Sequence, residues 1–172
     1  MIVKNGGICF GNASIRRGGI AQNTVKWSDG TYLASDVTQQ NMYLNEANRT
    51  NDQRGVKMRL GVGDTPPTIN DYWLDDVLVD GVDINTKIQC TSAQIGTNNK
   101  GDVIYTYTFS NTTGNTYTIK ELCLAMTPSG TSGTDVPNGR HIMLARTIIP
   151  ARTVGAHETI SFTYTVNPCG GA

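Results

Sequence analysis

The sequence predicts an all-β protein, and three observations support this prediction. The segment Val103–Phe109 (VIYTYTF) alternates large apolar or aromatic side chains with threonines, and Thr159–Val166 (TISFTYTV) repeats the pattern near the C-terminus. A period of two is typical of a β-strand that is buried more on one face than on the other. The abundance of Thr, Asn and Gly, with 19 glycines, favours short strands joined by turns.

The two best strands need a partner layer, because each carries apolar side chains on one face and hydroxyl groups on the other. We therefore expect a β-sandwich of jelly-roll or immunoglobulin-like type, with about seven or eight short antiparallel strands. The predicted core residues of the two strands share the apolar faces: Val103, Tyr105, Tyr107, Phe109, Ile160, Phe162, Tyr164 and Val166.

The N-terminal part of the chain has a different character from the rest. Residues 1–54 contain Gly-rich turns between short apolar pieces, and we expect them to form an extended arm ahead of a β-sandwich domain over 55–172. The polar stretch 35–51 allows two interpretations, a short helix capped by Ser35 or Asp36, or a long loop.

The domain begins with an expected strand at 56–62, where apolar and polar side chains alternate. The Pro-Pro pair at 66–67 must leave the sheet, because proline cannot donate a ladder hydrogen bond. The residues that follow predict one capped helical turn, which places Ile69, Trp73 and Leu74 on the core.

The later strands are bounded by turn sequences. The turn 98–101 leads into Val103–Phe109, residues 111–115 lead to a return strand, and Pro150 is expected to end a strand. The loop 127–140 is rich in Gly, Ser, Thr and Pro and is expected to be exposed. The remaining strands are expected at 76–79, 84–90, 117–126 and 142–149.

Composition argues against two classes of partner. The 172 residues carry a formal net charge of zero, and only 16% of them are charged. Proteins that hold nucleic acid by its phosphates usually carry a basic excess, and attraction to an anionic membrane surface needs one too. We therefore expect neither nucleic acid nor membrane as a partner. No secretory signal peptide and no apolar run long enough to span a bilayer is expected either.

The sequence offers no convincing pattern for a metal, a cofactor or catalysis. The four cysteines are widely spaced, without a Cys-x-x-Cys pair. The acidic residues within 75–83 lack the spacing of a calcium-binding loop. Neither His141 nor His157 lies in a nucleophile motif. We therefore expect a protein without metal or cofactor that is not an enzyme.

Glu121 and Arg146 are the two charges that interrupt otherwise apolar predicted strands. One interpretation makes Glu121 a buried acid in a functional site. The other pairs Glu121 with Arg146 across adjacent strands as a bidentate ion pair. We favour the structural ion pair, and a separation beyond salt-bridge reach would favour the first interpretation.

Five short blocks follow one another over the downstream two-thirds of the chain. They are Leu60–Pro67 with Asp71-Tyr72, Phe109–Gly114 (FSNTTG), Ile119–Leu124 (IKELCL), Met143–Arg146 (MLAR) with Pro150, and His157–Val166 (HETISFTYTV). Their order resembles a pattern in small virion structural proteins of tailed bacteriophages. The chain departs from that pattern at Lys120, Cys123 and His157, where a polar residue, glycine and glycine are expected. Residues 1–54 lie outside the resemblance.

The resemblance implies a structural role in a virion and no catalytic residue. It implies foremost an auxiliary or decoration protein on the capsid surface, which binds neighbouring capsid subunits and stabilises the particle. The alternative is a tail or tail-fibre-associated protein, with a host glycan as its ligand. The implied partners are other virion proteins, either the major capsid protein or tail proteins, and further copies of this chain in a homo-oligomer. The implied location is the virion, assembled in the host bacterial cytoplasm.

Overall fold

The structure is a computed structural model that describes four stretches of the chain and four isolated residues. The stretches are 55–75, 77–79, 88–126 and 141–167, and the isolated residues are Ile2, Lys26, Gly30 and Thr31. Most of the predicted arm 1–54, including the stretch 35–51, and the loop 127–140 lie outside the described residues. The division of the chain at residue 54 therefore stays a prediction.

Within the described residues the chain is all-β, with seven strands and no helix. No described segment is therefore a helix of the length and apolar character needed to cross a membrane. The strands are β1 (Val56–Gly61), β2 (Val77–Val79), β3 (Ile88–Thr97), β4 (Val103–Asn111), β5 (Tyr117–Met126), β6 (Ile142–Val154) and β7 (Thr159–Val166).

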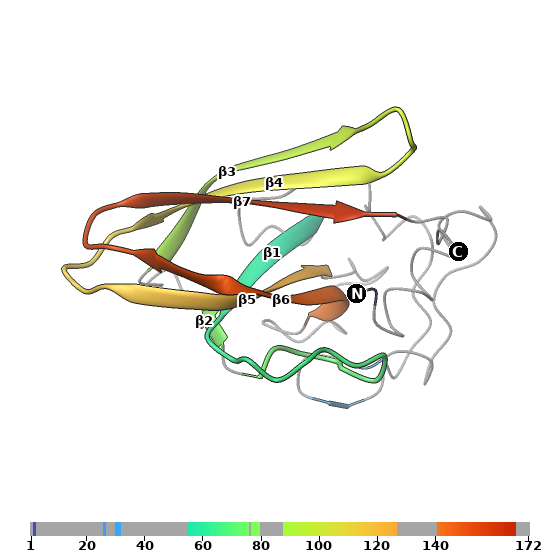
Figure 1. The fold of residues 1–172 in the computed structure, drawn as a ribbon, viewed down its shortest axis with the longest axis horizontal. Coiled ribbons are helices and arrows are strands. Elements are labelled where there is room, and N and C mark those ends of the chain that lie inside the picture. Colours follow the sequence, from blue (N-terminus) through green and yellow to red (C-terminus); the bar gives the residue numbers. More distant parts are fainter. Residues whose placement is uncertain are drawn as a thin grey trace, which may run out of the picture.

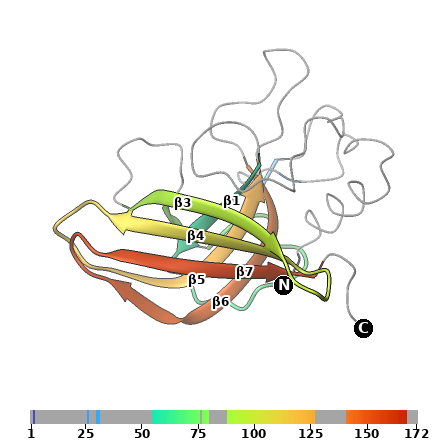
Figure 2. The same ribbon diagram turned by 90° about the horizontal axis from the view of Figure 1, so that it is seen from above.

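The strands form two antiparallel sheets that lie in two layers (Figure 1). One sheet has the order β2-β1-β5-β6, and the other has the order β3-β4-β7. Figure 2 shows the same layers from above, with β3 at one border of the three-stranded sheet. Two links that lie fully within the described residues cross between the layers, residues 112–116 from β4 to β5 and residues 155–158 from β6 to β7.

The core lies between the two sheets and contains side chains from both. Seven of the eight predicted core residues are buried, and the eighth, Val103, is half-buried and packs against them. Across the layers, the Tyr107 hydroxyl donates a hydrogen bond to the backbone carbonyl of Val56. Within the three-stranded sheet the rings of Phe109 and Phe162 lie 6.3 Å apart. The predicted facing of β4 and β7 is confirmed, although only β4 is central in its sheet and β7 lies at its border.

Asn111 ties together the two links that cross between the layers. Its side-chain amide nitrogen donates to the carbonyls of Asn115 at 2.6 Å and Gly155 at 2.7 Å. Its side-chain oxygen accepts from the Thr113 backbone amide at 3.0 Å. The Asn111 backbone amide also donates to the Glu158 carbonyl at 2.8 Å. One buried amide side chain therefore fixes both crossovers at the same end of the molecule.

The strand after the β4–β5 link differs from the expected return strand. The bounds of β5 match the prediction at 117–126, but β5 does not pair with β4. It pairs with β1 and β6 in the other sheet. The alternation within a strand indicates which side faces the core, but it does not indicate which sheet the strand joins.

The expectation that Pro150 ends a strand is wrong, because β6 continues through it to Val154. The pairing of β5 with β6 shifts between Ile119 and Glu121, opposite this proline. β6 is the border strand of its sheet. A border strand with an irregular register accommodates a proline, because no neighbour there requires its missing N–H.

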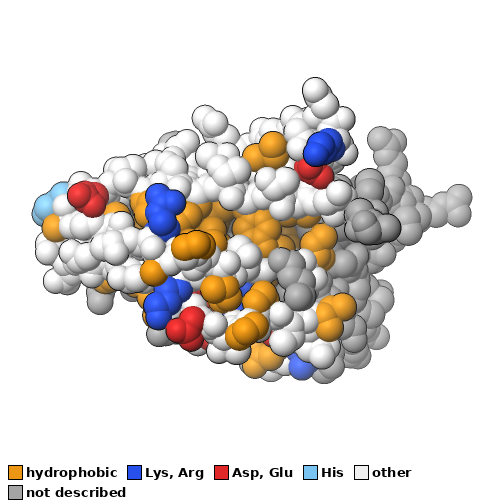
Figure 3. Space-filling model, in the orientation of Figure 1, with side chains coloured by type: hydrophobic (Ala, Val, Ile, Leu, Met, Phe, Trp, Pro, Cys, Tyr) orange, Lys and Arg blue, Asp and Glu red, His pale blue; other side chains and the backbone are white. Residues whose placement is uncertain are grey.

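The strand predicted at 84–90 is longer than expected. β3 runs from Ile88 to Thr97, and residues 84–87 lie outside the described residues. The turn after it forms as predicted. The Gly101 amide donates to the Asn98 carbonyl at 3.0 Å, and Gly101 has a positive φ of 79°. Figure 3 shows that charged side chains on this view of the molecule are few, and that some of them lie side by side with a charge of opposite sign.

Candidate functional site

The candidate site is the loop that joins β1 to β2, over residues 62–75, which we call the Arg146-held loop. It lies over the outer face of the four-stranded sheet, where Leu74 packs in a small apolar cluster separate from the main core. The other buried members of that cluster come from β5 and β6: Cys123, Ala125 and Met143. The loop therefore covers a sheet face that the core does not use.

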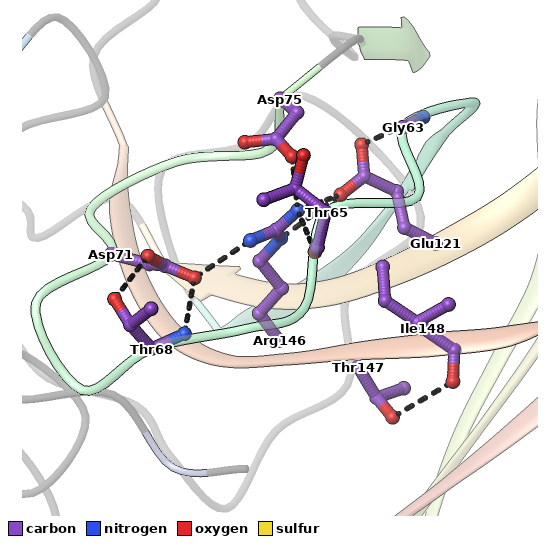
Figure 4. A network of polar contacts seen from close by, with 9 residues as sticks. All are labelled: Gly63, Thr65, Thr68, Asp71, Asp75, Glu121, Arg146, Thr147 and Ile148. Atoms are coloured by element: carbon purple, nitrogen blue, oxygen red, sulfur yellow. Dashed lines mark hydrogen bonds and ion pairs between the residues drawn. The ribbon is translucent and has the colours of Figure 1, made fainter.

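Arg146, on β6, binds this loop at several points (Figure 4). Its Nη1 donates to Asp71 Oδ2 at 2.7 Å, and its Nη2 donates to Asp75 Oδ2 at 2.8 Å. Nη2 also donates to the backbone carbonyl of Thr65 at 3.1 Å. One guanidinium group therefore holds the beginning, the middle and the end of the loop.

The same guanidinium group contacts Glu121, as the predicted pairing across adjacent strands requires. Both Nε and Nη2 of Arg146 lie 2.9 Å from Glu121 Oε2. The other carboxylate oxygen of Glu121 accepts a hydrogen bond from the Gly63 amide at 3.3 Å. The pair differs from the expected bidentate form in two respects. Only one carboxylate oxygen faces Arg146, and two loop aspartates share the guanidinium group.

The charged side chains of this cluster differ in how deeply they are buried. The side chains of Arg146 and Glu121 are 1% and 0% exposed, whereas those of Asp71 and Asp75 are 17% and 39% exposed. Two oppositely charged groups can be removed from water together only when each has partners of good geometry. The cluster therefore depends on the loop, because the loop supplies two of the three carboxylates.

The pKa values in the cluster reflect this arrangement. Burial by itself would raise the pKa of Asp71, but hydrogen bonds from Thr68 and then the contact with Arg146 outweigh it, so the pKa lies below 3.8. Burial by itself would lower the pKa of Arg146, but its hydrogen bonds to Asp71 and Glu121 outweigh it, so the pKa is raised. Both groups are therefore held in their charged forms.

Gly63 is required where the loop passes Glu121. A Cβ atom at this position would lie 2.8 Å from the Asp75 Cβ and 2.8 Å from Glu121 Oε1. Any side chain here would push the loop away from the carboxylate that anchors it. The glycine is therefore explained by close approach.

The predicted helical turn at the tip of the loop does not form a helix. The backbone amide and hydroxyl of Thr68 donate to the two Asp71 oxygens at 2.9 and 2.6 Å, and the Asp71 amide donates back to the Thr68 carbonyl at 3.3 Å. These bonds resemble half of a helix-capping box. The chain makes a single turn and then continues without a helix, and Asp71 is also bound by Arg146.

This turn corrects part of the expected core. Leu74 is buried and Trp73 is half-buried, as expected, but Ile69 is 61% exposed. The Trp73 ring stacks on His141 with centroids 5.6 Å apart, and His141 Nε2 lies 3.4 Å from Arg59 Nη2. Trp73 therefore faces the sheet, whereas Ile69 points away from it.

Tyr72 is the second apolar side chain that the loop exposes, at 39%. The ammonium group of Lys26 lies 5.2 Å from the centre of its ring. Gly30 passes so close that a Cβ there would lie 3.2 Å from the ring. Two described residues of the N-terminal part therefore approach one side of Tyr72. Trp27 and Tyr32 lie outside the described residues.

The charged side chains of this cluster hold the loop in place, and its carboxylates are occupied by contacts with Arg146. Each of its three carboxylates is engaged by Arg146, and within the described residues no group of three or more His, Cys, Asp or Glu side chains has the arrangement of a metal site. Sequence analysis singled out Glu121 and Arg146 because they interrupt apolar strands. The sequence did not connect Asp75 or Gly63 to this pair, because loop residues carry no periodicity that reveals their partners.

Comparison with family models, with curated proteins and with solved structures found no match to this chain.

Proposed function

We propose that this chain is a structural protein of a tailed-phage virion, and that the Arg146-held loop is the element with which it contacts a neighbouring virion protein. The proposed place is the capsid surface, as an auxiliary or decoration protein that stabilises the particle. The ordered blocks between residues 60 and 166 support the virion role, and no catalytic turnover is proposed.

One observation carries the docking part of the proposal. The loop exposes 61% of Ile69 at its tip, while its aspartates are turned inward to Arg146. The other charged pair of the loop, Asp64 with Lys120 at 3.2 Å, lies at the surface away from the core. A rigid scaffold that presents an uncharged apolar tip on a fixed loop favours contact with an apolar depression on another protein.

The exposed tip can be tested on particles that lack this protein. Purified wild-type protein is added to such particles, and the bound fraction is measured on a stained gel after sedimentation. We expect Ile69→Asp to weaken binding about tenfold or more, because it places a charge in an apolar contact. Thr165→Asp, on the exposed face of the three-stranded sheet, is the matched control and should bind as the wild type does. Equal binding by both variants would reject the loop as the contact.

The number of copies in purified virions separates the capsid role from the alternative. Hundreds of copies per particle support a capsid coat, and a handful supports a tail or fibre protein. In the alternative, the half-exposed ring of Tyr72 is the described aromatic that could stack on a host glycan. Retention of the protein on immobilised host glycans, lost in Tyr72→Ala, would favour that role.

We further propose that the two sheets form a β-sandwich of the jelly-roll or immunoglobulin-like type. The shared core and the contact of Tyr107 with Val56 across the layers support packing of one sheet on the other. The finer type depends on the total number and order of strands. An experimental structure that includes residues 1–54 and 127–140 would decide between these types.

A further inference from the structure

β3, a border strand of the three-stranded sheet, has a second half that lacks the usual protection against pairing with another chain. The second half of β3, residues Ser92–Thr97, pairs with β4 on one side in regular register. The described part of the chain places no strand on its other side, and residues 94–97 are exposed. The segment reads SAQIGT, with no charge and no proline.

The border strands of the four-stranded sheet differ in ways that discourage such pairing. β6 contains Pro150 and an irregular register, and Ile2 forms a bridge to it at Ala145. β2 has only three residues. Natural proteins use short strands, prolines, bulges and charges to prevent pairing at the border of a sheet. Ser92–Thr97 has no proline and no charge, and the register irregularity of β3 lies before it, between Cys90 and Ser92.

The side chains along β3 also favour a partner strand. Ala93 and Ile95 lie opposite the inward-facing Tyr107 and Tyr105, so they belong to the inner face of the sheet. Ile95 is nevertheless 37% exposed, because it lies near the border. On β7, the opposite border strand, all four inward side chains are at most 7% exposed. β3 is therefore the border strand that leaves an apolar inner side chain uncovered.

We propose that this border binds a second copy of the same chain, through antiparallel pairing of the two Ser92–Gly96 segments about a two-fold axis at Gln94. Pairing across a two-fold axis places residues of the same face opposite one another only when the axis passes through a residue. With the axis at Gln94, Ala93 of each copy lies opposite Ile95 of the other, so a small side chain faces the exposed large one on the inner face. The two Gln94 side chains meet on the outer face, where amide groups both donate and accept.

This register has no charge to oppose it, and it joins two three-stranded sheets into one continuous sheet. The proposal does not depend on a virion role, because it concerns the isolated protein in solution. A strand pair of about five residues extends about 17 Å, which is a modest contact, so we expect a dissociation constant between about 10 and 100 μM.

The test uses opposite charges at the position where the axis passes. Sedimentation velocity of the full chain should show a species at twice the 18.5 kDa mass of one chain as the concentration rises toward about 100 μM. Gln94→Lys and Gln94→Glu each place like charges opposite one another, and each should weaken association about tenfold. An equimolar mixture of the two variants should associate at least as well as the wild type.

Gln89→Lys is the matched control, because Gln89 is exposed on the same strand but lies outside the paired segment. It should leave association unchanged, and all three variants should keep the wild-type melting temperature within about 2 °C. A wild type that stays monomeric to about 100 μM would overturn the proposal. So would unchanged association of Gln94→Lys and Gln94→Glu, and a mixture that fails to recover would overturn the Gln94 axis.

Discussion

The outer faces of the two sheets contrast sharply, although the sheets share one core. On β7 every second residue is exposed, and its outer face presents Thr and Ser hydroxyls to solvent. Thr106 and Thr163 lie 3.3 Å apart through their hydroxyl oxygens on this face, and Thr108 and Ser161 lie 2.8 Å apart. On β5 six consecutive residues are buried, because the Arg146-held loop and its small apolar cluster cover the outer face as well.

The difference shows how burial on both faces changes the chemistry that a strand can carry. A strand with one open face needs only hydroxyls there, since water satisfies them. A strand covered on both faces that carries a charge must provide that charge with buried partners. Glu121 and Arg146 are tolerated in the four-stranded sheet because the loop aspartates and Gly63 complete their contacts.

The largest expected effect comes from the same substitution on the two faces of β7. Phe162→Asp places an unpaired carboxylate in the core, and we expect no soluble folded protein. Thr163→Asp, one residue away on the open face, should change the free energy of unfolding by less than about 1 kcal/mol. Thermal unfolding followed by circular dichroism compares the two variants. A normal transition in Phe162→Asp would break the assignment of faces.

The next effect separates a buried arginine from an exposed one on the same strand. Arg146→Met leaves three carboxylates without their cation, and we expect a loss of about 3–5 kcal/mol in the free energy of unfolding. Arg152→Met removes only a surface contact over the Phe162 ring, at 5.9 Å from its centre, and should cost about 1 kcal/mol or less. Urea denaturation measures both. Equal losses would mean that the cluster contributes no more than a surface group.

A smaller effect depends on pH and sharpens the role of the loop. The folded-state pKa of Asp71 lies below its ordinary value of 3.8, so ionised Asp71 stabilises the fold above that pH. This contribution is lost as the pH falls through the lowered folded-state pKa. Asp71→Asn should therefore cost about 1–2 kcal/mol at pH 7 and progressively less below the ordinary value.

The control for this pH dependence is Asp64→Asn in the same loop. Asp64 pairs with Lys120 at the surface, where its side chain is 75% exposed, and exposed pairs contribute little. Asp64→Asn should therefore change the free energy of unfolding little, both at pH 7 and in the acid range. A cost of Asp71→Asn that stays constant from pH 7 to the acid range would contradict the charged interaction with Arg146.

The smallest expected effect concerns the link between the two sheets at the β6–β7 crossover. His157 has a positive φ of 59°, a conformation that is strained for residues other than glycine. His157→Gly should raise the free energy of unfolding by about 0–1 kcal/mol, because the relief of strain exceeds the added freedom of the unfolded chain. His157→Ala keeps the strain and should show no gain. A clear loss in both variants would instead assign a stabilising contact to the imidazole.

The contrast between the open outer face of one sheet and the covered outer face of the other also explains which parts of the structure were predictable from the sequence. The core faces of β4 and β7 followed from their alternation, because one side is buried and the other is open. Glu121 and Arg146 were recognisable as a pair because a charge in an apolar strand needs a partner. The loop partners Asp71 and Asp75 were not, since a loop residue finds its contacts only after the chain folds over a particular sheet face. The continuation of β6 past Pro150 was missed because sequence alone does not place a strand at the border of a sheet.

Amide hydrogen exchange in the wild type and in Arg146→Met tests most directly whether Arg146 holds the loop in one shape. The amides of Gly63 and Thr68 donate to Glu121 and Asp71, both of which contact Arg146. We predict that these amides are protected in the wild type and exchange much faster in Arg146→Met, while the amides of β4 and β7 still exchange slowly. Unchanged protection of Gly63 and Thr68 in the variant would show that the loop keeps its shape without Arg146, which would contradict this account.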